Sequence, residues 1–220
     1  MFEQDFTESN LSTIKINKNM NQLPVIFACS HHRKGNSDYA ATLFLEGIRS
    51  AGGNGEIIYL GDMDFNHCTG CLKCRTAEDH RCIFADKDNA QKLYNKIIHA
   101  PFTFFASPIY FYHLPSRFKT FIDRGQWAFE AMVNSSPIIE SLHVRPAYAC
   151  FIAGRPKGEK LFEGAELSLK FFMKFFKAEL NQTITLKGLD TPQDLKNNPE
   201  KCTELIAAGK QAWIRNISDD

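Results

Sequence analysis

The sequence predicts an α/β domain in which a parallel sheet is covered by helices on both faces. Two observations favour this fold class. First, short apolar runs rich in β-branched and aromatic residues alternate along the chain with longer segments whose apolar residues recur at helical spacing. Second, the short runs are apolar at almost every position, as expected for strands buried on both faces. This alternation indicates parallel strands joined by right-handed helical crossovers.

Strands and helices are expected to alternate after a polar, Asn-rich arm at residues 1–23. A Ser-Pro pair at residues 107–108 should end the third strand, because proline keeps the residue before it out of the helical region. We assign no element to residues 138–146, and we expect residues 24–220 to form one domain. The expected strands are 24–28, 56–60, 102–106, 146–153 and 182–188, and the expected helices are 37–50, 88–100, 115–132, 161–180 and 199–217.

Composition and charge exclude several classes of function. The 220 residues include 44% hydrophobic and 12% aromatic residues, which is enough for a buried core. Lys plus Arg number 26 and Asp plus Glu 25, so the net charge of +1 gives no reason to expect binding to nucleic acid or to an anionic membrane. No apolar run approaches the roughly 20 residues that cross a bilayer, and the amino terminus lacks the apolar centre of a secretory signal. We therefore expect a cytoplasmic protein.

The first expected strand is followed by a loop that suits a phosphate group. Residues 30–38 read SHHRKGNSD and lead into a helix, whose N-terminal N–H groups and positive dipole end attract anions. The chain has neither a Walker A motif nor a G-x-G-x-x-G fingerprint, which favours a monophosphate such as that of FMN. An ordinary loop with Ser37 as helix N-cap is the alternative on local sequence. The candidate phosphate-binding residues are Ser30, Arg33, Gly35, Asn36 and Ser37.

The loop after the third expected strand is richly aromatic. Ligands of open α/β sheets bind at the carboxyl edge, where this loop and the loop at 153–157 must lie. Exposed aromatic side chains there suggest a flat ligand such as the isoalloxazine ring of FMN. His113 is the candidate catalytic group, as a hydrogen-bond or proton donor, although packing among the aromatic side chains explains it equally well. The candidate ring-binding residues are Pro108, Ile109, Tyr110, Phe111, Tyr112, His113 and Leu114, together with Ala153, Gly154 and Arg155.

A cysteine-rich segment at residues 67–87 follows the second expected strand. Cys68, Cys71 and Cys74 recur at every third residue, and Cys82 lies nearby. In ferredoxin loops the spacing C-x2-C-x2-C supplies three ligands to a 4Fe-4S cluster, so we expect such a cluster on these four cysteines. One zinc ion is the second interpretation, although zinc is more often held by two separated C-x2-C pairs, and four free thiols are the third. We expect this segment at the same edge of the sheet as the two ligand loops.

These motifs resemble those of a known superfamily. The aromatic loop leads into a helix with a lysine and an Asp-Arg pair, and the residues at the matching positions are Ser107, Pro108, Tyr110, Lys119, Asp123 and Arg124. Together with the first loop and the cysteine run, this pattern resembles the flavodoxin-like NADPH-dependent FMN reductase superfamily, especially its iron-sulfur flavoprotein branch, over residues 24–188. The resemblance implies a three-layer flavodoxin-like sandwich with five parallel strands in the order 2-1-3-4-5, and one FMN and one 4Fe-4S cluster per subunit. It also implies a homo-oligomer, a dimer or a tetramer, that brings the cluster of one subunit to the flavin of another.

The function expected from these features is an FMN-dependent redox protein that couples two-electron flavin chemistry to one-electron transfer through the cluster. NAD(P)H and a ferredoxin-like protein are the candidate electron partners, and neither nucleic acid nor membrane is expected. Two alternatives stay open. One is a cluster-free NAD(P)H-dependent reductase of FMN, quinone or another small acceptor. The other is a non-catalytic electron carrier or redox sensor.

Overall fold

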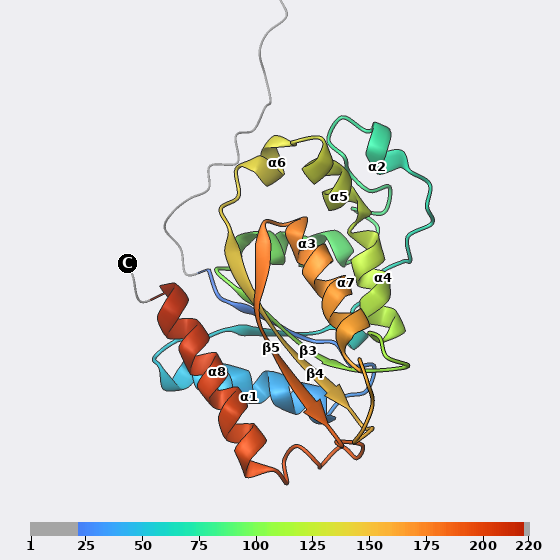
Figure 1. The fold of residues 1–220 in the computed structure, drawn as a ribbon. Helices are drawn as coiled ribbons and strands as arrows, with labels where there is room; N and C mark the ends of the chain where they lie inside the picture. Colours follow the sequence, from blue (N-terminus) through green and yellow to red (C-terminus); the bar gives the residue numbers. More distant parts are fainter. Residues whose placement is uncertain (1–21, 218–220) are drawn as a thin grey trace, which may run out of the picture.

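The computed structural model describes residues 22–217. At its centre is a five-stranded parallel sheet in the order β2-β1-β3-β4-β5 (Figure 1), which confirms the expected fold class and strand order. Most of the expected N-terminal arm lies outside the described residues. The strands are β1 (Val25–Ala28), β2 (Glu56–Tyr59), β3 (Thr103–Pro108), β4 (Arg145–Ala153) and β5 (Ala178–Lys187).

Helices cover both faces of the sheet, because alternate strand residues point to opposite sides. Ile26 and Phe104 pack in one core with α1 and α8, whereas Phe27 and Phe105 pack in a second core with α3, α4, α5 and α7. None of the described helices is long and apolar enough to cross a membrane. The helices are α1 (Asn36–Ser50), α2 (Lys73–Thr76), α3 (Ala90–His99), α4 (Ser116–Arg124), α5 (Gln126–Val133), α6 (Pro137–Glu140), α7 (Glu163–Lys174) and α8 (Pro199–Ile217), with a 3-10 turn η1 (Leu60–Asp62) after β2.

Helices α1 and α8 cross so closely that each needs a glycine at the contact. A Cβ atom on Gly47 would lie 2.0 Å from the carbonyl oxygen of Ile206, and one on Gly209 would lie 2.0 Å from the carbonyl oxygen of Phe44. The atoms in the way belong to the backbone, so no side-chain rotation can make room. The crossing therefore fixes α1, and with it the N-terminus of this helix, relative to the sheet.

A buried arginine in β4 is hydrogen-bonded to the ends of α3 and α7, two helices of the layer that also contains α4 and α5. Arg145 donates hydrogen bonds to the carbonyl oxygens of Ile97 at 2.7 Å, Ala100 at 3.3 Å and Phe176 at 2.5 Å. Ile97 lies in the last turn of α3, and Ala100 and Phe176 lie just after the ends of α3 and α7, where helical carbonyl groups lack intrahelical partners. Burial lowers the pKa of Arg145 to about 10, so the side chain remains charged at neutral pH.

The third strand is longer than expected. We expected the Ser-Pro pair to end it, but β3 continues through Pro108, which is paired in register with Ile152 of β4. The following N–H, that of Ile109, donates to the Ile152 carbonyl oxygen at 2.8 Å. A proline at the end of a strand removes only its own N–H from the ladder, so the neighbouring strand still directs the chain.

Two expected helices are also shorter than their apolar periodicity indicates. The helix expected at 115–132 divides at Gly125 into α4 and α5. The Phe172 ring lies so close to Gly125 that a Cβ atom there would be 2.7 Å from it. The helix expected at 161–180 ends at Lys174, and Lys177 adopts a left-handed φ of 48° before β5 begins at Ala178. The short helix α6 lies at the start of the connection to which no element was assigned.

Candidate functional site

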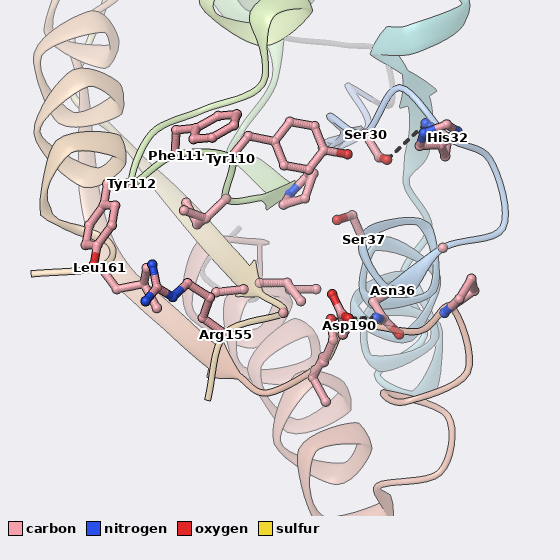
Figure 2. A pocket seen from close by; sticks show the side chains of 18 of the residues that line it. Ser30, His32, Asn36, Ser37, Tyr110, Phe111, Tyr112, Arg155, Leu161 and Asp190 are labelled. Carbon is pink, nitrogen blue, oxygen red and sulfur yellow. Dashed lines mark hydrogen bonds between the residues drawn. The ribbon is translucent and has the colours of Figure 1, made fainter. Parts of the chain in front are cut away.

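A cavity of about 600 Å³ lies at the carboxyl edge of the sheet, and its size is in the usual range for small-molecule sites. Its walls come from the loops that follow β1, β3, β4 and β5 (Figure 2). We call it the edge pocket. Of the residues predicted to bind the cofactor, those that line it are Ser30, Arg33, Gly35, Asn36, Ser37, Pro108, Ile109, Tyr110, Phe111, Tyr112, Ala153, Gly154 and Arg155.

The first loop brings the N-terminus of α1 to the edge pocket without a side-chain cap. Gly35 occupies the N-cap position, makes no side-chain hydrogen bond to the helix, and has no atom within 4 Å of where its Cβ would stand. The Ser37 hydroxyl points into the pocket, and Ser30 Oγ accepts a hydrogen bond from the His32 N–H at 3.1 Å (Figure 2). Because the first N–H groups of a helix lack intrahelical acceptors, this wall suits an anion such as a phosphate.

Arg33 lines the pocket, but its guanidinium group already has partners. It lies over the Tyr59 ring at 3.3 Å from the centroid, donates to Asp38 Oδ2 at 3.2 Å, and forms a second ion pair with Asp62. Burial raises the pKa of Asp38, although the Lys34 N–H at 2.7 Å and Arg33 favour the charged carboxylate. Arg33 therefore stabilises the fold of the first loop, and its charge is shared with two carboxylates.

Asn36 has a structural role that its sequence position did not reveal. Its side-chain amide donates to the carbonyl oxygens of Leu189 at 3.2 Å and Thr191 at 2.9 Å, and its Oδ1 accepts the Leu195 N–H at 3.0 Å. These three residues belong to the connection between β5 and α8. Asn36 therefore holds two walls of the edge pocket together, and its side chain is engaged away from a phosphate at the N-terminus of α1.

A tight turn at residues 110–113, which we call the aromatic turn, forms the opposite wall. The Tyr110 N–H donates to the His113 carbonyl oxygen at 2.9 Å, and the His113 N–H donates back to the Tyr110 carbonyl oxygen at 3.0 Å. Phe111 and Tyr112 have left-handed φ values of 50° and 65°, and Phe111 is fully exposed. Such φ values are costly for residues with a Cβ atom, so the turn displays its aromatic rings at the expense of backbone strain.

His113 and Leu114, which we expected to bind the flavin, do not line the edge pocket. His113 Nδ1 accepts the Leu114 N–H at 2.9 Å, and its Nε2 lies 3.0 Å from Ser168 Oγ. Because Nδ1 accepts this N–H, the ring nitrogen that can donate to Ser168 is Nε2. Leu114 is 5% exposed and belongs to the core under α7. The packing interpretation of His113 thus fits its surroundings better than a catalytic one.

Six lining residues were missed by sequence reasoning, and three of them lie in the connection that follows β5. A Cβ atom on Gly154 would lie 2.3 Å from Asp190 Oδ1, so glycine at position 154 makes room for this carboxylate. The signal for this wall is topological, since the loop after β5 must reach the same carboxyl edge as the loops after β1, β3 and β4. The residues that were missed are His32, Ile152, Leu161, Leu189, Asp190 and Pro192.

Cys68, Cys71, Cys74 and Cys82 all line one small cavity of about 30 Å³, which we call the cysteine cavity. Its volume is about that of one water molecule in the liquid. Within residues 22–217, no group of three or more His, Cys, Asp or Glu side chains is arranged to hold a metal ion. The fold therefore brings the four predicted ligands to one place, while their sulfur atoms do not form a coordination site.

The cysteine thiols differ in acidity. Burial, followed by the influence of Cys82 and Glu130, raises the pKa of Cys74. A hydrogen bond from the Lys73 N–H lowers the pKa of Cys71, which is exposed. Cys71 is therefore the more acidic and the more exposed of these two thiols.

The cysteine cavity lies at the far end of α4 from the edge pocket, which corrects the expectation that both lie at one edge of the sheet. At the start of α4, the Arg117 N–H donates to Nε2 of His31 in the first loop at 3.4 Å, whereas Arg124 at its end lines the cysteine cavity. Figure 1 shows the short α2 helix near α5, the helix that follows α4. The chain leaves the carboxyl edge after η1 and follows α4, because Arg117 and Arg124 bind the carbonyl oxygens of Phe65 and Asn66.

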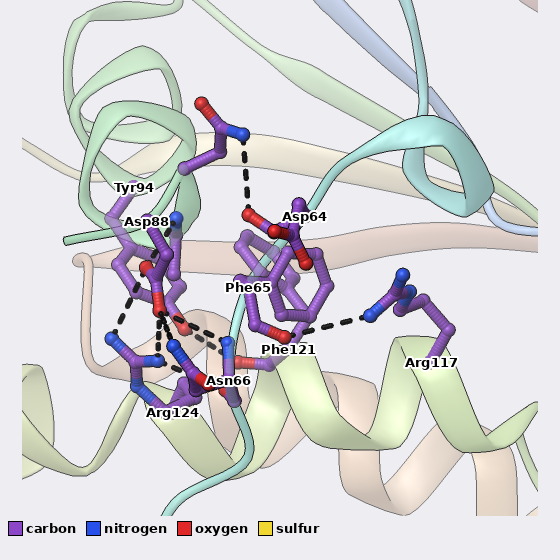
Figure 3. Close-up of polar contacts among 10 residues, drawn as sticks. Asp64, Phe65, Asn66, Asp88, Tyr94, Arg117, Phe121 and Arg124 are labelled. Atoms are coloured by element: carbon purple, nitrogen blue, oxygen red, sulfur yellow. Dashed lines mark hydrogen bonds and ion pairs between the residues drawn. The ribbon is translucent and has the colours of Figure 1, made fainter. Parts of the chain in front are cut away.

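A buried ion pair holds both ends of the cysteine-rich segment (Figure 3). Arg124 Nη1 donates to Asp88 Oδ2 at 2.7 Å and to the Asn66 carbonyl oxygen at 2.9 Å. Asp88 also accepts the N–H groups of Asn66 at 3.0 Å and Ala90 at 3.1 Å, and the paired side chains are 1% and 2% exposed. Burial acts to raise the pKa of Asp88, but Arg124 and these amide donors outweigh it and lower the pKa.

Comparison with known proteins decides the family. The family model described as NADPH-dependent FMN reductase matches residues 24–154, which is more than half of the chain. The chain belongs to the NADPH-dependent FMN reductase family. The matched residues of this family member include the first loop, the cysteine-rich segment and the aromatic turn, and they end before the Asp190 wall of the edge pocket.

Individual relatives of this FMN reductase family member are distant. An iron-sulfur flavoprotein of Archaeoglobus fulgidus is 26% identical over 95 residues, which cover 43% of this chain and 41% of the relative, less than half of its length. The NAD(P)H:quinone oxidoreductase from Methanothermobacter marburgensis has 19% identity and a TM-score of 0.63, over 86% of this chain and 94% of that one. An FMN-dependent NADH-azoreductase from Bacillus anthracis str. Ames Ancestor, in complex with FMN, has 13% identity and a TM-score of 0.61, over 86% of this chain and 98% of that one. These two structures share the fold.

Proposed function

We propose that this family member is an FMN-dependent oxidoreductase that accepts electrons from NAD(P)H. The observation that carries the proposal is the edge pocket, in which the uncapped N-terminus of α1 and the aromatic turn face one cavity of about 600 Å³. FMN has a phosphate, which suits the N-terminus of α1, and a flat ring, which suits the aromatic turn. The family match and the FMN complex of the azoreductase support this assignment.

Different residues of the edge pocket would bind the phosphate, the ring and the hydroxyl groups of FMN. Ser30, Ser37 and the first N–H groups of α1 would bind the phosphate, because they are the polar groups at the N-terminal wall. Tyr110 would contact the ring, Leu161 would exclude water from it, and the Asp190 carboxylate would accept hydrogen bonds from hydroxyl groups between ring and phosphate. FMN, when bound, supplies two-electron chemistry and releases electrons singly, while the protein sets its position and potential.

We further propose that Cys68, Cys71, Cys74 and Cys82 hold one 4Fe-4S cluster. Their spacing, their convergence on one cavity and the curated iron-sulfur flavoprotein relative support this finer assignment. Four thiols are the right donors, but a cavity of about 30 Å³ is too small for a cluster. Cluster uptake therefore requires the segment around the exposed Cys71 to move outward, while Cys74 stays buried against α5.

A cluster-free reductase is the second candidate, and the narrowness of the cysteine cavity favours it. A single zinc ion needs less room than a cluster, and four thiols suit zinc as well as iron. In that case electrons would pass from NAD(P)H through FMN to a small acceptor such as a quinone. A carrier that accepts electrons only from another protein is distinguished from both by its failure to react with NAD(P)H.

The flavin assignment is tested by reconstitution. The purified chain, incubated with excess FMN and desalted, should retain FMN, and chromatography of the released cofactor should show FMN rather than FAD. NAD(P)H should then bleach the flavin absorbance. Ser30→Glu places a carboxylate at the phosphate wall and should weaken FMN binding at least tenfold, whereas Ser141→Glu on an exposed surface should leave it unchanged. Retention of FAD, or no flavin at all, would refute the proposal.

The cluster assignment needs anaerobic work. Chain reconstituted with iron and sulfide should contain four of each per cluster, as this cluster type requires, together with broad visible absorbance. Cys71→Ser should lose this absorbance and keep FMN, because the edge pocket shares no residue with the cysteine cavity. Uptake of zinc alone by the wild-type chain, or a full complement of iron and sulfide in Cys71→Ser, would favour the cluster-free reductase.

A further inference from the structure

Two buried N–H groups without acceptors belong to residues that line the cysteine cavity. Within the described part of the chain, Arg124 Nε and Trp127 Nε1 are buried and have no hydrogen-bond partner. Both residues line the same cavity as the four cysteines. A buried donor without an acceptor costs about 1–3 kcal/mol, so two such donors at one small cavity indicate that an acceptor is missing there.

Both donors are held in place by their surroundings. The two terminal nitrogens of Arg124 are engaged, since Nη1 donates to Asp88 and the Asn66 carbonyl oxygen and Nη2 lies 3.4 Å from Asp88 Oδ1. Trp127 is 4% exposed, and its ring packs at 5.9 Å from the Tyr94 ring centroid. These contacts hold both side chains in place, and the Arg124 guanidinium group also lies over the Phe84 ring at 5.0 Å from its centroid. An occupant of the cavity that both residues line would supply the missing acceptors.

We propose that Arg124 Nε–H and Trp127 Nε1–H donate hydrogen bonds to the sulfur atoms of the metal centre held by the four cysteines. This inference rests on the proposed 4Fe-4S cluster. Thiolate and sulfide sulfur atoms carry negative charge and accept hydrogen bonds, and such bonds are among the main determinants of cluster potential. Because the reduced cluster is one charge more negative, donors at its sulfur atoms stabilise the reduced form and raise the midpoint potential.

The charged side chains near the cysteine cavity neutralise one another, so the hydrogen bonds from Arg124 and Trp127 would be important for the charge of a cluster there. Asp88 neutralises Arg124 in the buried ion pair, and the nearly buried Glu130 pairs with Arg75 at 3.2 Å. The net charge of these four side chains is zero, so no unpaired cation among them compensates an anionic cluster. Trp127 carries no charge at all, so its effect on a cluster can come only through the N–H dipole and packing.

Trp127→Phe gives the cleanest test, because it removes the N–H and keeps an aromatic ring. The variant and the wild-type chain are reconstituted anaerobically, and three quantities are measured: iron and sulfide content, midpoint potential by electron paramagnetic resonance titration, and exchangeable-proton couplings to the reduced cluster before and after transfer to deuterium oxide. We expect unchanged content, a more negative potential and the loss of one exchangeable-proton coupling. Arg124→Lys keeps the positive charge, lacks the Nε group, and should shift the potential in the same direction.

Trp213→Phe is the matched control, since Trp213 packs with the core on the opposite face of the sheet. It should leave potential and couplings unchanged. Full iron content in Trp127→Phe with the wild-type potential and the wild-type couplings would overturn this inference and leave the cluster proposal standing. A wild-type chain that takes up no iron and sulfide would overturn both. A shift of equal size in Trp213→Phe would show that general packing, rather than the N–H group, sets the potential.

Discussion

Asp88 shows how one residue can fix a segment that has little apolar content of its own. Its carboxylate accepts hydrogen bonds from the backbone on both sides of the cysteine run, at Asn66 and Ala90, and it pairs with Arg124 on α4. The lowered pKa of Asp88 means that the folded state favours the ionised carboxylate. The stabilisation is therefore fully present above the pKa of an unfolded aspartate, and it is lost as the pH falls through the lower folded value.

Asp88→Asn should lower the free energy of unfolding by about 3–5 kcal/mol at pH 7, because it leaves Arg124 buried without its counter-charge. The difference between variant and wild type should begin to shrink below about pH 4, where aspartate in the unfolded chain becomes neutral, and it should disappear at lower pH, where the folded carboxylate is protonated as well. Urea unfolding with a chelator present, followed by circular dichroism at several pH values, measures both effects. The exposed Asp86 pairs only with the exposed Arg81, so Asp86→Asn should change little. A pH-independent difference for Asp88→Asn would contradict this account.

For individual residues, the sequence predicted which loops line the pocket, but it did not predict which residues the side chains of these loops contact. The serines of the first loop could be predicted as pocket residues because a strand, a short polar loop and a helix start define that position locally. Asn36 could not be understood in this way, since its partners Leu189, Thr191 and Leu195 lie more than 150 residues away. The same holds for Arg33, whose partner Asp62 comes from the turn after β2.

The close crossing of α1 and α8 predicts that alanine in place of either contact glycine destabilises the fold. Gly47→Ala and Gly209→Ala each gain about 1 kcal/mol of helix propensity, but each also places a Cβ atom 2.0 Å from a backbone oxygen. Overpacking of this kind costs about 1–3 kcal/mol or more, so both variants should be net destabilised. Thermal unfolding measures the effect, and Gly158→Ala, whose Cβ would meet side chains no closer than 3.5 Å, is the control. If both alanine variants were more stable than the wild type, α1 and α8 could move apart without a loss of stability.

In the aromatic turn, one substitution should raise the stability of the fold and weaken FMN binding at the same time. Replacing Phe111-Tyr112 by Asn-Gly supplies residues that tolerate left-handed φ values and should raise the free energy of unfolding by about 1 kcal/mol. The same change removes two rings from the edge pocket and should weaken FMN binding. Ser135→Gly relieves a similar φ of 51° far from the pocket, so it should stabilise without affecting FMN. Denaturation and flavin titration of the three chains test this, and unchanged FMN affinity would exclude a role for the turn.

Among the elements, periodicity predicted where helices begin better than where they end. The phenylalanines at 171, 172, 175 and 176 continue a helical pattern past Lys174, although Phe175 and Phe176 are buried in a turn that leads into β5. Residues 115–132 likewise show one apolar pattern, yet the helix divides at Gly125, where the Phe172 ring leaves no room for a Cβ atom. Both boundaries depend on tertiary contacts, which a local pattern does not contain.

The whole molecule separates its two candidate redox sites along α4. The helix has nine residues and thus a length of about 13 Å, and it runs from the first loop to the cysteine cavity. The two sites therefore do not share an edge within one subunit. The sequence resemblance implies a homo-oligomer in which the cluster of one subunit lies near the FMN of another, and we propose that arrangement here.

Mixed oligomers test that proposal directly. Ser30→Glu is expected to lack FMN, and Cys71→Ser is expected to lack the cluster, so neither variant alone should reduce a cluster with electrons from NAD(P)H. Co-expressed and reconstituted together, they should regain NAD(P)H-dependent cluster reduction if electrons cross between subunits. Stopped-flow absorbance measures the reaction, and tagging the two chains differently confirms that they have assembled. Wild-type activity combined with an inactive mixed oligomer would place electron transfer within one subunit.

The link made by Asn36 also sets the order in which this protein can mature. The first loop is among the earliest parts of the domain to be synthesised, but the wall that contains Asp190 follows some 150 residues later. At about 5–20 residues per second, a ribosome needs roughly 8–30 s to cover that interval. During this time the nascent chain carries the serines of the phosphate wall without the surface that closes the pocket opposite them. We therefore expect cofactor capture to be a late event in biogenesis, because a chain whose translation stops before residue 189 lacks the Asp190 wall of the edge pocket.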